Sequence, residues 1–338
     1  MQPIEDVRAI SRIAYGFIAS KALFAALDLD LFGRLKGAPK PLAALAAAAG
    51  IAPERLRTLL ASLVSLGLIS RAGDTFANSP AADRYLVPGS PAYFGDYYRF
   101  QVSRQLYPAL TRLDAGLAGN NAGLLFGGEE GLMADPVEAA AFSRAQHAGS
   151  LGPAVLLARS LDLSGRKRLL DVAGGTGAFS ITLCQRHPGL TATVLDFPNV
   201  AALAETCIAE AGLAGRISTI GANALATDWP AGQDVVLMSY LLSAVEADAI
   251  DTLLAKAHAA LAPGGLLILH DFMLDDDEQG PDLAAHWFLL NLALNAGTVS
   301  FTPAELSRRL EPAGFVDVTA REHIHDITKL VLAHKPAG

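Results

Sequence analysis

The sequence predicts an α/β protein in which a parallel sheet with helices on both faces follows a helical, winged-helix-like domain. Two observations predict this class. From residue 166 on, short apolar runs of strand type alternate with helix-like segments, which is typical of a parallel sheet covered on both faces. Before residue 100, apolar residues recur mainly at helical spacing. With 338 residues, 51% of them hydrophobic, the chain can form one large domain or two ordinary ones.

Composition excludes several classes of protein. The formal net charge of −8 argues against nucleic acid, because a general phosphate-backbone binder needs a basic face. Two cysteines, Cys184 and Cys207, form neither a disulfide framework nor a cysteine-based zinc module. The first residues, MQPIEDVRAISR, carry charges throughout and lack the apolar stretch of a signal peptide. Apolar stretches elsewhere are short or interrupted, so we expect a cytoplasmic protein that does not span a membrane.

The N-terminal part reads as helices followed by a hairpin. Residues 4–36 have the apolar spacing of an amphipathic helix. A further helix follows, then a turn at Gly50, a second helix from Pro53 to about Leu66, and a short hairpin through residues 72–74. This order is that of a winged helix. The second helix offers only two arginines to DNA, so the pattern favours a packing or dimerisation module.

Domain limits follow from where the pattern changes. Residues 92–160 look helical apart from a glycine-rich break at 116–131, and the Ser164-Gly165 turn precedes the strand–helix alternation. We therefore divide the chain into residues 1–100, a winged-helix-like domain; 101–164, linking helices that line a pocket; and 165–338, the α/β domain. Its expected strands are residues 168–172, 191–197, 217–221, 234–240 and 265–272.

A glycine-rich turn after the first of these strands carries the chemistry. The strand ending in Asp171-Val172 runs into Ala173-Gly174-Gly175-Thr176-Gly177 and then into a helix. Glycines let the backbone approach a ligand, and the helix N-terminus adds donors. Asp196, at the end of the next strand, is placed to accept the hydroxyls of a ribose. The spacing differs from the dinucleotide pattern G-x-G-x-x-G, and the lysine of a nucleotide-triphosphate loop is missing.

The motif D-V-A-G-G-T-G resembles the first motif of class I S-adenosylmethionine (SAM)-dependent methyltransferases, which have a Rossmann-like fold. With HPGLTATVLDFPNV, LAPGGLLILHDFML and the N-terminal helices, nearly the whole chain resembles the dimeric O-methyltransferase family of plant phenolic and hydroxyindole methyltransferases and their bacterial relatives. The resemblance implies a small-molecule substrate, S-adenosyl-L-homocysteine (SAH) as product, a homodimer formed through the N-terminal domain, and no metal. It implies cofactor contacts from Asp171, Gly174, Gly175, Gly177, Asp196, Phe197, Asn223, Ala224 and Ser239.

One departure from the family concerns the catalytic base. Typical members carry a histidine after the fourth strand, in a pattern like S-H-x-L-H-D-W, whereas this chain reads S-Y-L-L-S-A-V with Ser243 at the histidine position. A serine hydroxyl is too weak a base for a phenol or alcohol proton at neutral pH. Either another residue is the base, or the acceptor has no proton to lose.

Polar and aromatic side chains on the linking helices and after the fourth and fifth strands are candidates for positioning the substrate. They are Tyr97, Arg99, Gln101, Arg104, Gln146, His147, Tyr240, Ser243, His286, Trp287 and Asn291. Arginine is the natural partner of a substrate carboxylate, although surface ion pairs explain Arg99 and Arg104 equally well. His147 and His286 are either substitute bases or structural histidines. A metal pair of His270 and Asp271, with His286 as a distant ligand, is a weaker alternative to an Asp271 that orients other groups.

These observations leave three hypotheses. The first is S-methylation of a thioether carboxylate, such as 4-methylthio-2-hydroxybutyrate, to a sulfonium on the route to dimethylsulfoniopropionate. It needs placement and exclusion of water but no base, and it makes the chain similar to bacterial methylthiohydroxybutyrate S-methyltransferases. The alternative is O- or C-methylation of an aromatic or polyketide molecule, with His147 or His286 as base. The third, a non-catalytic regulator that uses its winged helix on DNA, fits poorly with the negative charge.

Overall fold

The computed structural model describes residues 3–120 and 135–338, so the predicted glycine-rich break at 116–131 lies largely outside the described residues. The chain divides into two compact units, Met1–Gln105 and Leu106–Gly338, which are described separately. Most of the segment 101–164, assigned to linking helices, belongs to the second unit.

The N-terminal unit contains helices and a small sheet with strand order β1-β3-β2. Its elements are α1 (Val7–Ala14), α2 (Gly16–Asp28), α3 (Leu31–Arg34), β1 (Lys40–Pro41), α4 (Leu42–Ala49), α5 (Pro53–Ser65), β2 (Ile69–Ala72), β3 (Thr75–Asn78), α6 (Pro80–Tyr85) and the π-helix η1 (Tyr97–Leu106). The predicted order of helix, helix and hairpin is present in α4, α5 and β2–β3. Buried leucines of α4 and α5, among them Leu45, Leu56 and Leu60, form the core beneath it.

The prediction of one helix over residues 4–36 is wrong, because this segment forms three helices. Tyr15 ends α1 with a backbone conformation outside the helical range (φ −100°, ψ 4°). Asp30 separates α2 from α3 in the left-handed region, with φ 51°, a conformation that aspartate tolerates better than most residues. No single described helix is long and apolar enough to span a membrane; α1 and α2 together reach that length and composition, but as a pair bent by 41°.

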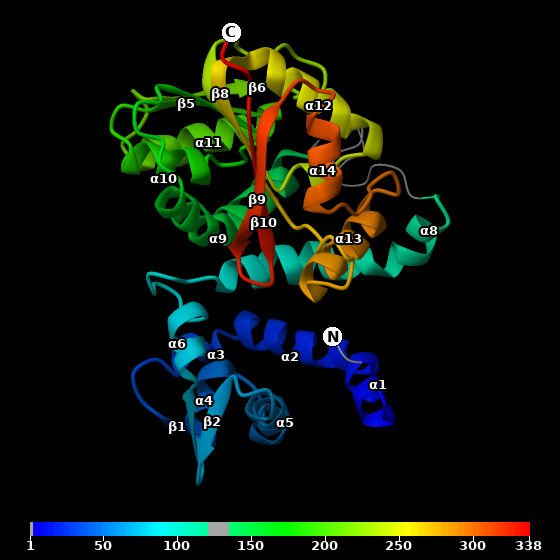
Figure 1. Cartoon of the computed structure of the whole chain (residues 1–338). Helices are drawn as coiled ribbons and strands as arrows, with labels where there is room; N and C mark the ends of the chain where they lie inside the picture. Colours follow the sequence, from blue (N-terminus) through cyan, green and yellow to red (C-terminus); the bar gives the residue numbers. More distant parts are fainter. Residues whose placement is uncertain (1–2, 121–134) are drawn as a thin grey trace. The chain divides into compact units, whose positions relative to one another are not determined.

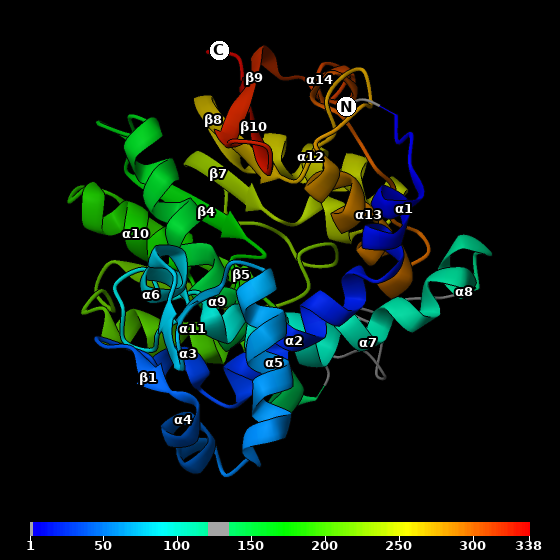
Figure 2. The same cartoon turned by 90° about the horizontal axis from the view of Figure 1, so that it is seen from below.

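The C-terminal unit is a seven-stranded sheet with the order β6-β5-β4-β7-β8-β10-β9. Its strands are β4 (Arg168–Val172), β5 (Thr191–Asp196), β6 (Ile217–Gly221), β7 (Gln233–Ser239), β8 (Leu261–Asp271), β9 (Val316–Ile324) and β10 (Thr328–His334). Strands β4 to β8 pair in parallel, and β10 pairs antiparallel with β8 and β9. Figure 2 shows β5, β4, β7 and β8 following one another across the sheet.

Helices cover both faces of this sheet. They are α9 (Pro136–Ser160), α10 (Ala178–Arg186), α11 (Pro198–Glu210), α12 (Ala247–Ala260), α13 (Asp282–Leu294) and α14 (Pro303–Leu310), preceded by the shorter α7 (Tyr107–Ala109), η2 (Leu110–Arg112) and α8 (Leu113–Leu117). In Figure 1 the green helices α9 to α11 lie on one side of the sheet, and α12 and α14 lie on the other. Alternate residues of β4 and β7 enter two separate cores, Leu170 and Val236 on one face and Leu169 and Val235 on the other. The predicted Rossmann-like α/β class is therefore confirmed.

All five predicted strands are present, whereas β9 and β10 were not anticipated. β9 reads VDVTAREHI and is largely exposed, so its charges hide the apolar run that marks a buried strand. The β9–β10 hairpin completes the sheet beside β8. Thr328 of this hairpin is connected to Ser239 at the end of β7 through the buried side chain of His270.

Candidate active site

A cavity lies at the carboxyl ends of β4, β5 and β7, where the strand order reverses between β4 and β7. Ligands of open α/β sheets bind at this switch point. The cavity holds about 1190 Å³ including its solvent-open mouth, and the described residues that line it belong to the C-terminal unit. It is lined by Phe142, Ser143, Gln146, His147, Ser150, Asp171, Ala173, Gly174, Gly175, Thr176, Ala178, Phe179, Leu195, Asp196, Phe197, Val200, Ala222, Asn223, Ala224, Leu225, Ser239, Tyr240, Leu241, Ala244, Val245 and Leu253.

The glycine loop turns sharply between β4 and α10. Ala173, Gly175 and Gly177 have φ values of 53°, 58° and 77°, in the left-handed region that glycine adopts at little cost. Gly177 directly precedes α10 and, unlike the other predicted cofactor residues, does not line the cavity. It ends the loop, and α10 begins at the next residue.

Asp171 lies beneath the loop and has an incomplete set of partners. Its Oδ2 accepts a 2.7 Å hydrogen bond from the Ser180 hydroxyl, but its buried Oδ1 has no partner among residues 3–120 and 135–338. Burial raises the pKa of Asp171 to about 7. A Cβ on Gly174 would lie 2.7 Å from the carboxyl carbon of Asp171, so this position accepts only glycine while the carboxyl group stays in place.

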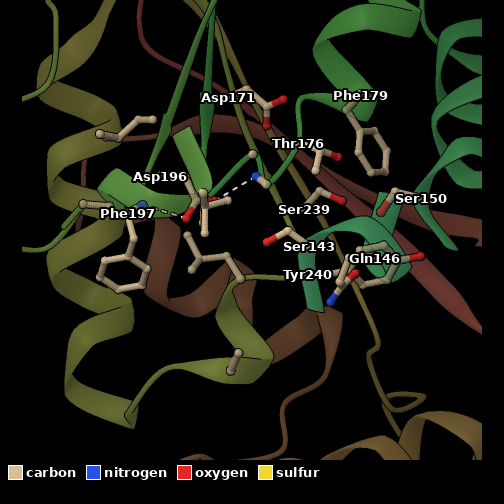
Figure 3. A pocket seen from close by; sticks show the side chains of 18 of the residues that line it. Ser143, Gln146, Ser150, Asp171, Thr176, Phe179, Asp196, Phe197, Ser239 and Tyr240 are labelled. Atoms are coloured by element: carbon tan, nitrogen blue, oxygen red, sulfur yellow. Dashed lines mark hydrogen bonds between the residues drawn. The ribbon is translucent and has the colours of Figure 1, made fainter. Parts of the chain in front are cut away.

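Asp196 ends β5 on the other side of the loop. Its two oxygens accept backbone N–H bonds from Gly175, at 2.8 Å, and from Phe197, at 2.7 Å, shown as dashed lines in Figure 3. Burial raises the pKa of Asp196 to about 6. Each oxygen keeps a second lone pair, so the carboxylate is held by the loop and still able to accept ligand hydroxyls. Farther along the wall, Asn223 Oδ1 accepts the backbone N–H of Leu225 at 2.9 Å.

Helix α9 presents polar side chains to the cavity. Ser143, Gln146, His147 and Ser150 follow the i, i+3, i+4, i+7 spacing of one helix face, and Figure 3 shows Ser143, Gln146 and Ser150 around the cavity. The Nδ1 atom of His147 lies 2.6 Å from the hydroxyl of Thr176 in the glycine loop. Burial lowers the pKa of His147, so its imidazole is neutral at pH 7. Ser143 and Ser150 were not predicted, although their helical spacing from Gln146 is a signal for them.

Beyond the end of β7 the wall is aromatic. Tyr240 has φ 57°, and its ring packs at 4.6 Å from the ring of His270 and 5.4 Å from that of Phe272. The ring of Phe272 in turn stacks on Trp287 of α13 at 4.4 Å. Tyr240 lines the cavity, whereas Phe272 and Trp287 do not.

Ser243, at the position of the family's histidine base, is fully buried and does not line the cavity. Its hydroxyl donates to Asp271 Oδ1 at 2.7 Å, and its backbone N–H donates to Asp271 Oδ2 at 3.0 Å. The amide of Asn291 donates to the Ser243 carbonyl at 2.7 Å. Asp271 also accepts the N–H of Phe272 at 2.9 Å, and burial raises its pKa to about 7. Ser243 and Asn291 thus belong to a buried hydrogen-bonded cluster around Asp271, and neither lines this cavity.

The suggested metal pair of His270 and Asp271 is wrong. Consecutive strand residues point to opposite faces: His270 contacts Ser239 and Thr328, whereas Asp271 contacts Ser243. His286 is exposed on α13, so the three do not converge on one ion.

Four predicted substrate residues, Tyr97, Arg99, Gln101 and Arg104, belong to the N-terminal unit, and their relation to the cavity stays a prediction. The two arginines are paired inside that unit: Arg99 Nε lies 3.0 Å and an Arg104 guanidinium nitrogen 3.1 Å from one oxygen of Asp28. The ion-pair interpretation of these arginines therefore has structural support.

A glycine loop at the switch point, an acid at the next strand end and a cavity between them define a SAM-dependent methyltransferase. Comparison with known proteins agrees: residues 126–316 match the O-methyltransferase domain and residues 11–88 match the O-methyltransferase dimerisation domain. The chain belongs to the O-methyltransferase family.

Two curated relatives from streptomycetes match almost the whole chain. The tetracenomycin polyketide synthesis 8-O-methyl transferase of Streptomyces glaucescens is 35% identical, with 94% of this chain and 95% of the relative covered. The 3-hydroxy-5-methyl-1-naphthoate 3-O-methyltransferase of Streptomyces sahachiroi is 33% identical, with 91% and 89% covered. Human N-acetylserotonin methyltransferase, solved in complex with SAM, superimposes with a TM-score of 0.84 at 25% identity, over 99% of this chain and all of that one.

These matches confirm the predicted enzyme class, the cofactor and the N-terminal dimerisation domain. They give no support to the resemblance to S-methyltransferases.

Proposed function

We propose that this enzyme methylates an aromatic natural product of polyketide type, at oxygen or at carbon. Its relatives support this acceptor class, since two of them are named as O-methyltransferases of a polyketide and a naphthoate. The aromatic side chains of Phe179 and Tyr240 on the cavity wall support it as well, because flat rings pack well against aromatic side chains. The hypothesis of thioether S-methylation has no comparable support.

The residues around the glycine loop fit the cofactor. Oδ1 of Asp171, which has no partner among the described residues, and the spare lone pairs of Asp196 suit the ammonium and hydroxyl donors of a nucleoside-linked amino acid, and the N–H groups of the loop suit its carboxylate. When bound, S-adenosylmethionine supplies an electrophilic methyl group. Asp196 would accept the ribose hydroxyls, and the missing side chain of Gly174 leaves the room that the loop needs.

The observation that carries the proposal is the position of His147. It lines the cavity with its Nδ1 held at 2.6 Å by Thr176, and burial keeps its pKa low. When Nδ1 donates to the threonine oxygen, Nε2 is the nitrogen that accepts a proton. His147 would then remove the acceptor's proton, while Thr176 of the glycine loop fixes the direction of its ring. In typical family members the histidine at the position of Ser243 removes this proton.

This proposal is tested by turnover of SAM with mass-spectrometric detection of products. The acceptor panel contains hydroxynaphthoates, anthraquinones and catechols, together with 4-methylthio-2-hydroxybutyrate. We expect a phenolic or ring-carbon product, and a loss in turnover of about a hundredfold or more in His147→Ala. His286→Ala, on the exposed face of α13, is the matched control and should keep wild-type turnover.

The pH dependence separates the two chemistries. A base on His147 makes turnover fall as pH drops through the lowered pKa of this residue, because protonation removes the lone pair. Methylation of a thioether releases no proton and has a flat profile. A permanent cation as product, with a flat profile and an active His147→Ala variant, would overturn the proposal and restore S-methylation.

We further propose that the enzyme is a homodimer formed through the N-terminal unit. The match to the dimerisation domain supports this, as does α1, where Val7, Ile10 and Ile13 are 72%, 57% and 71% exposed. An apolar helix face of this kind is costly in water unless another surface covers it. Sedimentation should give a dimer for the wild type and a shift toward monomer for Ile10→Asp combined with Ile13→Asp.

A further inference from the structure

His270 is a buried histidine of β8 that connects the cavity to the C-terminal hairpin. Its Nδ1 lies 2.8 Å from the hydroxyl of Ser239, which lines the cavity. Its Nε2 lies 3.0 Å from the hydroxyl of Thr328, at the start of β10. Both ring nitrogens are therefore engaged, and the side chain has no exposed surface.

The surroundings of His270 fix its ring. The ring packs edge-on against Tyr240 at 4.6 Å and against His323 at 4.6 Å, and the N–H of Tyr240 donates to the His270 carbonyl at 2.8 Å. His323 is itself held, because its Nε2 donates to the carbonyl of Pro153 in α9 at 3.0 Å. His323 of the hairpin thus contacts both α9, at Pro153, and His270, which holds Ser239 at the end of β7.

Burial and the neighbouring His323 keep the pKa of His270 well below its usual value, so the imidazole is neutral and has one donor and one acceptor nitrogen. A neutral ring permits two arrangements. If Nδ1 carries the proton, it donates a hydrogen bond to the Ser239 oxygen, and the Ser239 O–H can donate into the cavity. If Nε2 carries the proton and donates to Thr328, Ser239 donates to Nδ1 and presents only oxygen lone pairs to the cavity.

We propose that His270 is a positioning residue for the cofactor: it donates from Nε2 to Thr328, accepts the Ser239 hydroxyl at Nδ1, and so turns the lone pairs of Ser239 toward the cavity. The charge of the ligand favours this arrangement, because the methyl donor carries a sulfonium and an ammonium group, to which oxygen lone pairs are attracted and an O–H hydrogen is not. His270 does not line the cavity, so it acts on the bound cofactor only through Ser239.

The first test is a double-mutant cycle on ligand binding, which is independent of the acceptor and of the proposed base. Titration calorimetry measures the Kd of SAM and of SAH for the wild type, Ser239→Ala, His270→Phe and the double variant. Phenylalanine keeps the ring packing but removes both hydrogen bonds. We expect each single variant to weaken SAM about tenfold and SAH less, since SAH has lost the sulfonium charge. The double variant should be no weaker than either single one.

Additive losses, or equal losses for SAM and SAH, would overturn the proposal, because His270 would then act through general packing or without regard to charge. If His270→Phe fails to fold, Thr328→Val tests the same series of hydrogen bonds, from Ser239 through His270 to Thr328, at its other end. This variant removes the acceptor of Nε2 and should lower the SAM preference over SAH, whereas Thr319→Val, an exposed threonine of β9, should not.

The second test reads the proton directly. Nitrogen NMR of histidine-labelled protein, with the His270 signals assigned by their loss in His270→Phe, distinguishes protonated from unprotonated ring nitrogens. We expect a protonated Nε2 and an unprotonated Nδ1 in the wild type, and a change of this pattern in Thr328→Val. A protonated Nδ1 in the wild type contradicts the proposal.

Discussion

Two buried carboxyl groups, Asp171 at the end of β4 and Asp271 at the end of β8, have similar electrostatics and different surroundings. Burial raises the pKa of both to about 7. Asp171 lines the cavity, accepts one side-chain hydrogen bond, from Ser180, and has an oxygen without a partner in the described part of the chain. Asp271 lies behind the cavity wall and accepts the hydroxyl and N–H of Ser243 and the N–H of Phe272.

The difference shows how to separate a binding carboxyl from a structural one. Burying a carboxyl group costs free energy unless hydrogen bonds replace its hydration. The chain itself supplies those bonds to Asp271, so this residue stabilises the fold. Within the described residues it leaves one oxygen of Asp171 without a partner, so that oxygen is available to a ligand in the cavity.

The largest expected effect is a difference in the free energy of unfolding between variants of the two carboxyl groups. Asp271→Ala leaves the donors of Ser243 and Phe272 buried without an acceptor, and should lower the free energy of unfolding by about 3 to 5 kcal/mol. Asp171→Ala removes an acceptor that only Ser180, by its hydroxyl and its backbone N–H, uses among the described residues, and should cost about 1 to 2 kcal/mol. Urea unfolding without cofactor measures both. Equal losses would break the comparison, as would an unchanged SAM Kd in Asp171→Ala.

A second prediction concerns the loop above Asp171. In Gly174→Ala the new Cβ would lie 2.7 Å from the carboxyl carbon of Asp171, so loop or carboxyl must move, and the SAM Kd should rise about a hundredfold. Gly152→Ala is the matched control, because a Cβ there meets nothing within 4 Å and its φ is outside the left-handed region. This control should bind SAM normally and gain up to about 1 kcal/mol of stability. Normal SAM binding by Gly174→Ala would show that the loop has room to adjust.

The sequence predicted well which residues form the glycine-loop end of this cavity, because that end depends on local backbone. The strand, the turn of Gly174, Gly175 and Gly177, and the acid Asp196 at the next strand end follow one another in the chain. Backbone conformation and spacing therefore carry the information. The same holds for the five parallel strands, each of which carries a short run rich in apolar residues.

The side-chain contacts behind the other cavity wall, around Ser243 and His270, were predicted less well, because they join segments far apart in sequence. Ser243 was recognised as a departure, but its pairing with Asp271 and Asn291 depends on contacts across 28 and 48 residues. The link from Ser239 to Thr328 through His270 depends on a hairpin whose exposed strand β9 carries too many charges to read as a strand. Side-chain networks of this kind leave no periodic pattern in a sequence.

A third prediction uses the pKa of Asp196, which is raised to about 6. In the proposed cofactor complex, ribose hydroxyls donate to the ionised carboxylate of Asp196, so binding would favour the deprotonated form. Affinity is therefore complete above this pKa and falls as pH drops through it. Between pH 7 and pH 5 the Kd of SAH should rise about tenfold. Calorimetry at both values checks this, and Asp196→Asn should bind weakly with little dependence on pH. A pH dependence that persists in Asp196→Asn assigns the titration to another group, with Asp171 the next candidate.

The smallest expected effect concerns Ser243, and it tests whether the family's base position has become structural. The hydroxyl of Ser243 donates to Asp271 and points away from the cavity, so Ser243→Ala removes one of several donors to a carboxyl group that keeps the others. We expect a loss of about 1 kcal/mol in the free energy of unfolding. We also expect a turnover within about threefold of the wild type, because no proton passes through this residue. A loss approaching a hundredfold, with stability unchanged, would mean that Ser243 takes part in proton transfer, and the distinction between the ligand-facing Asp171 and the structural Asp271 would no longer hold.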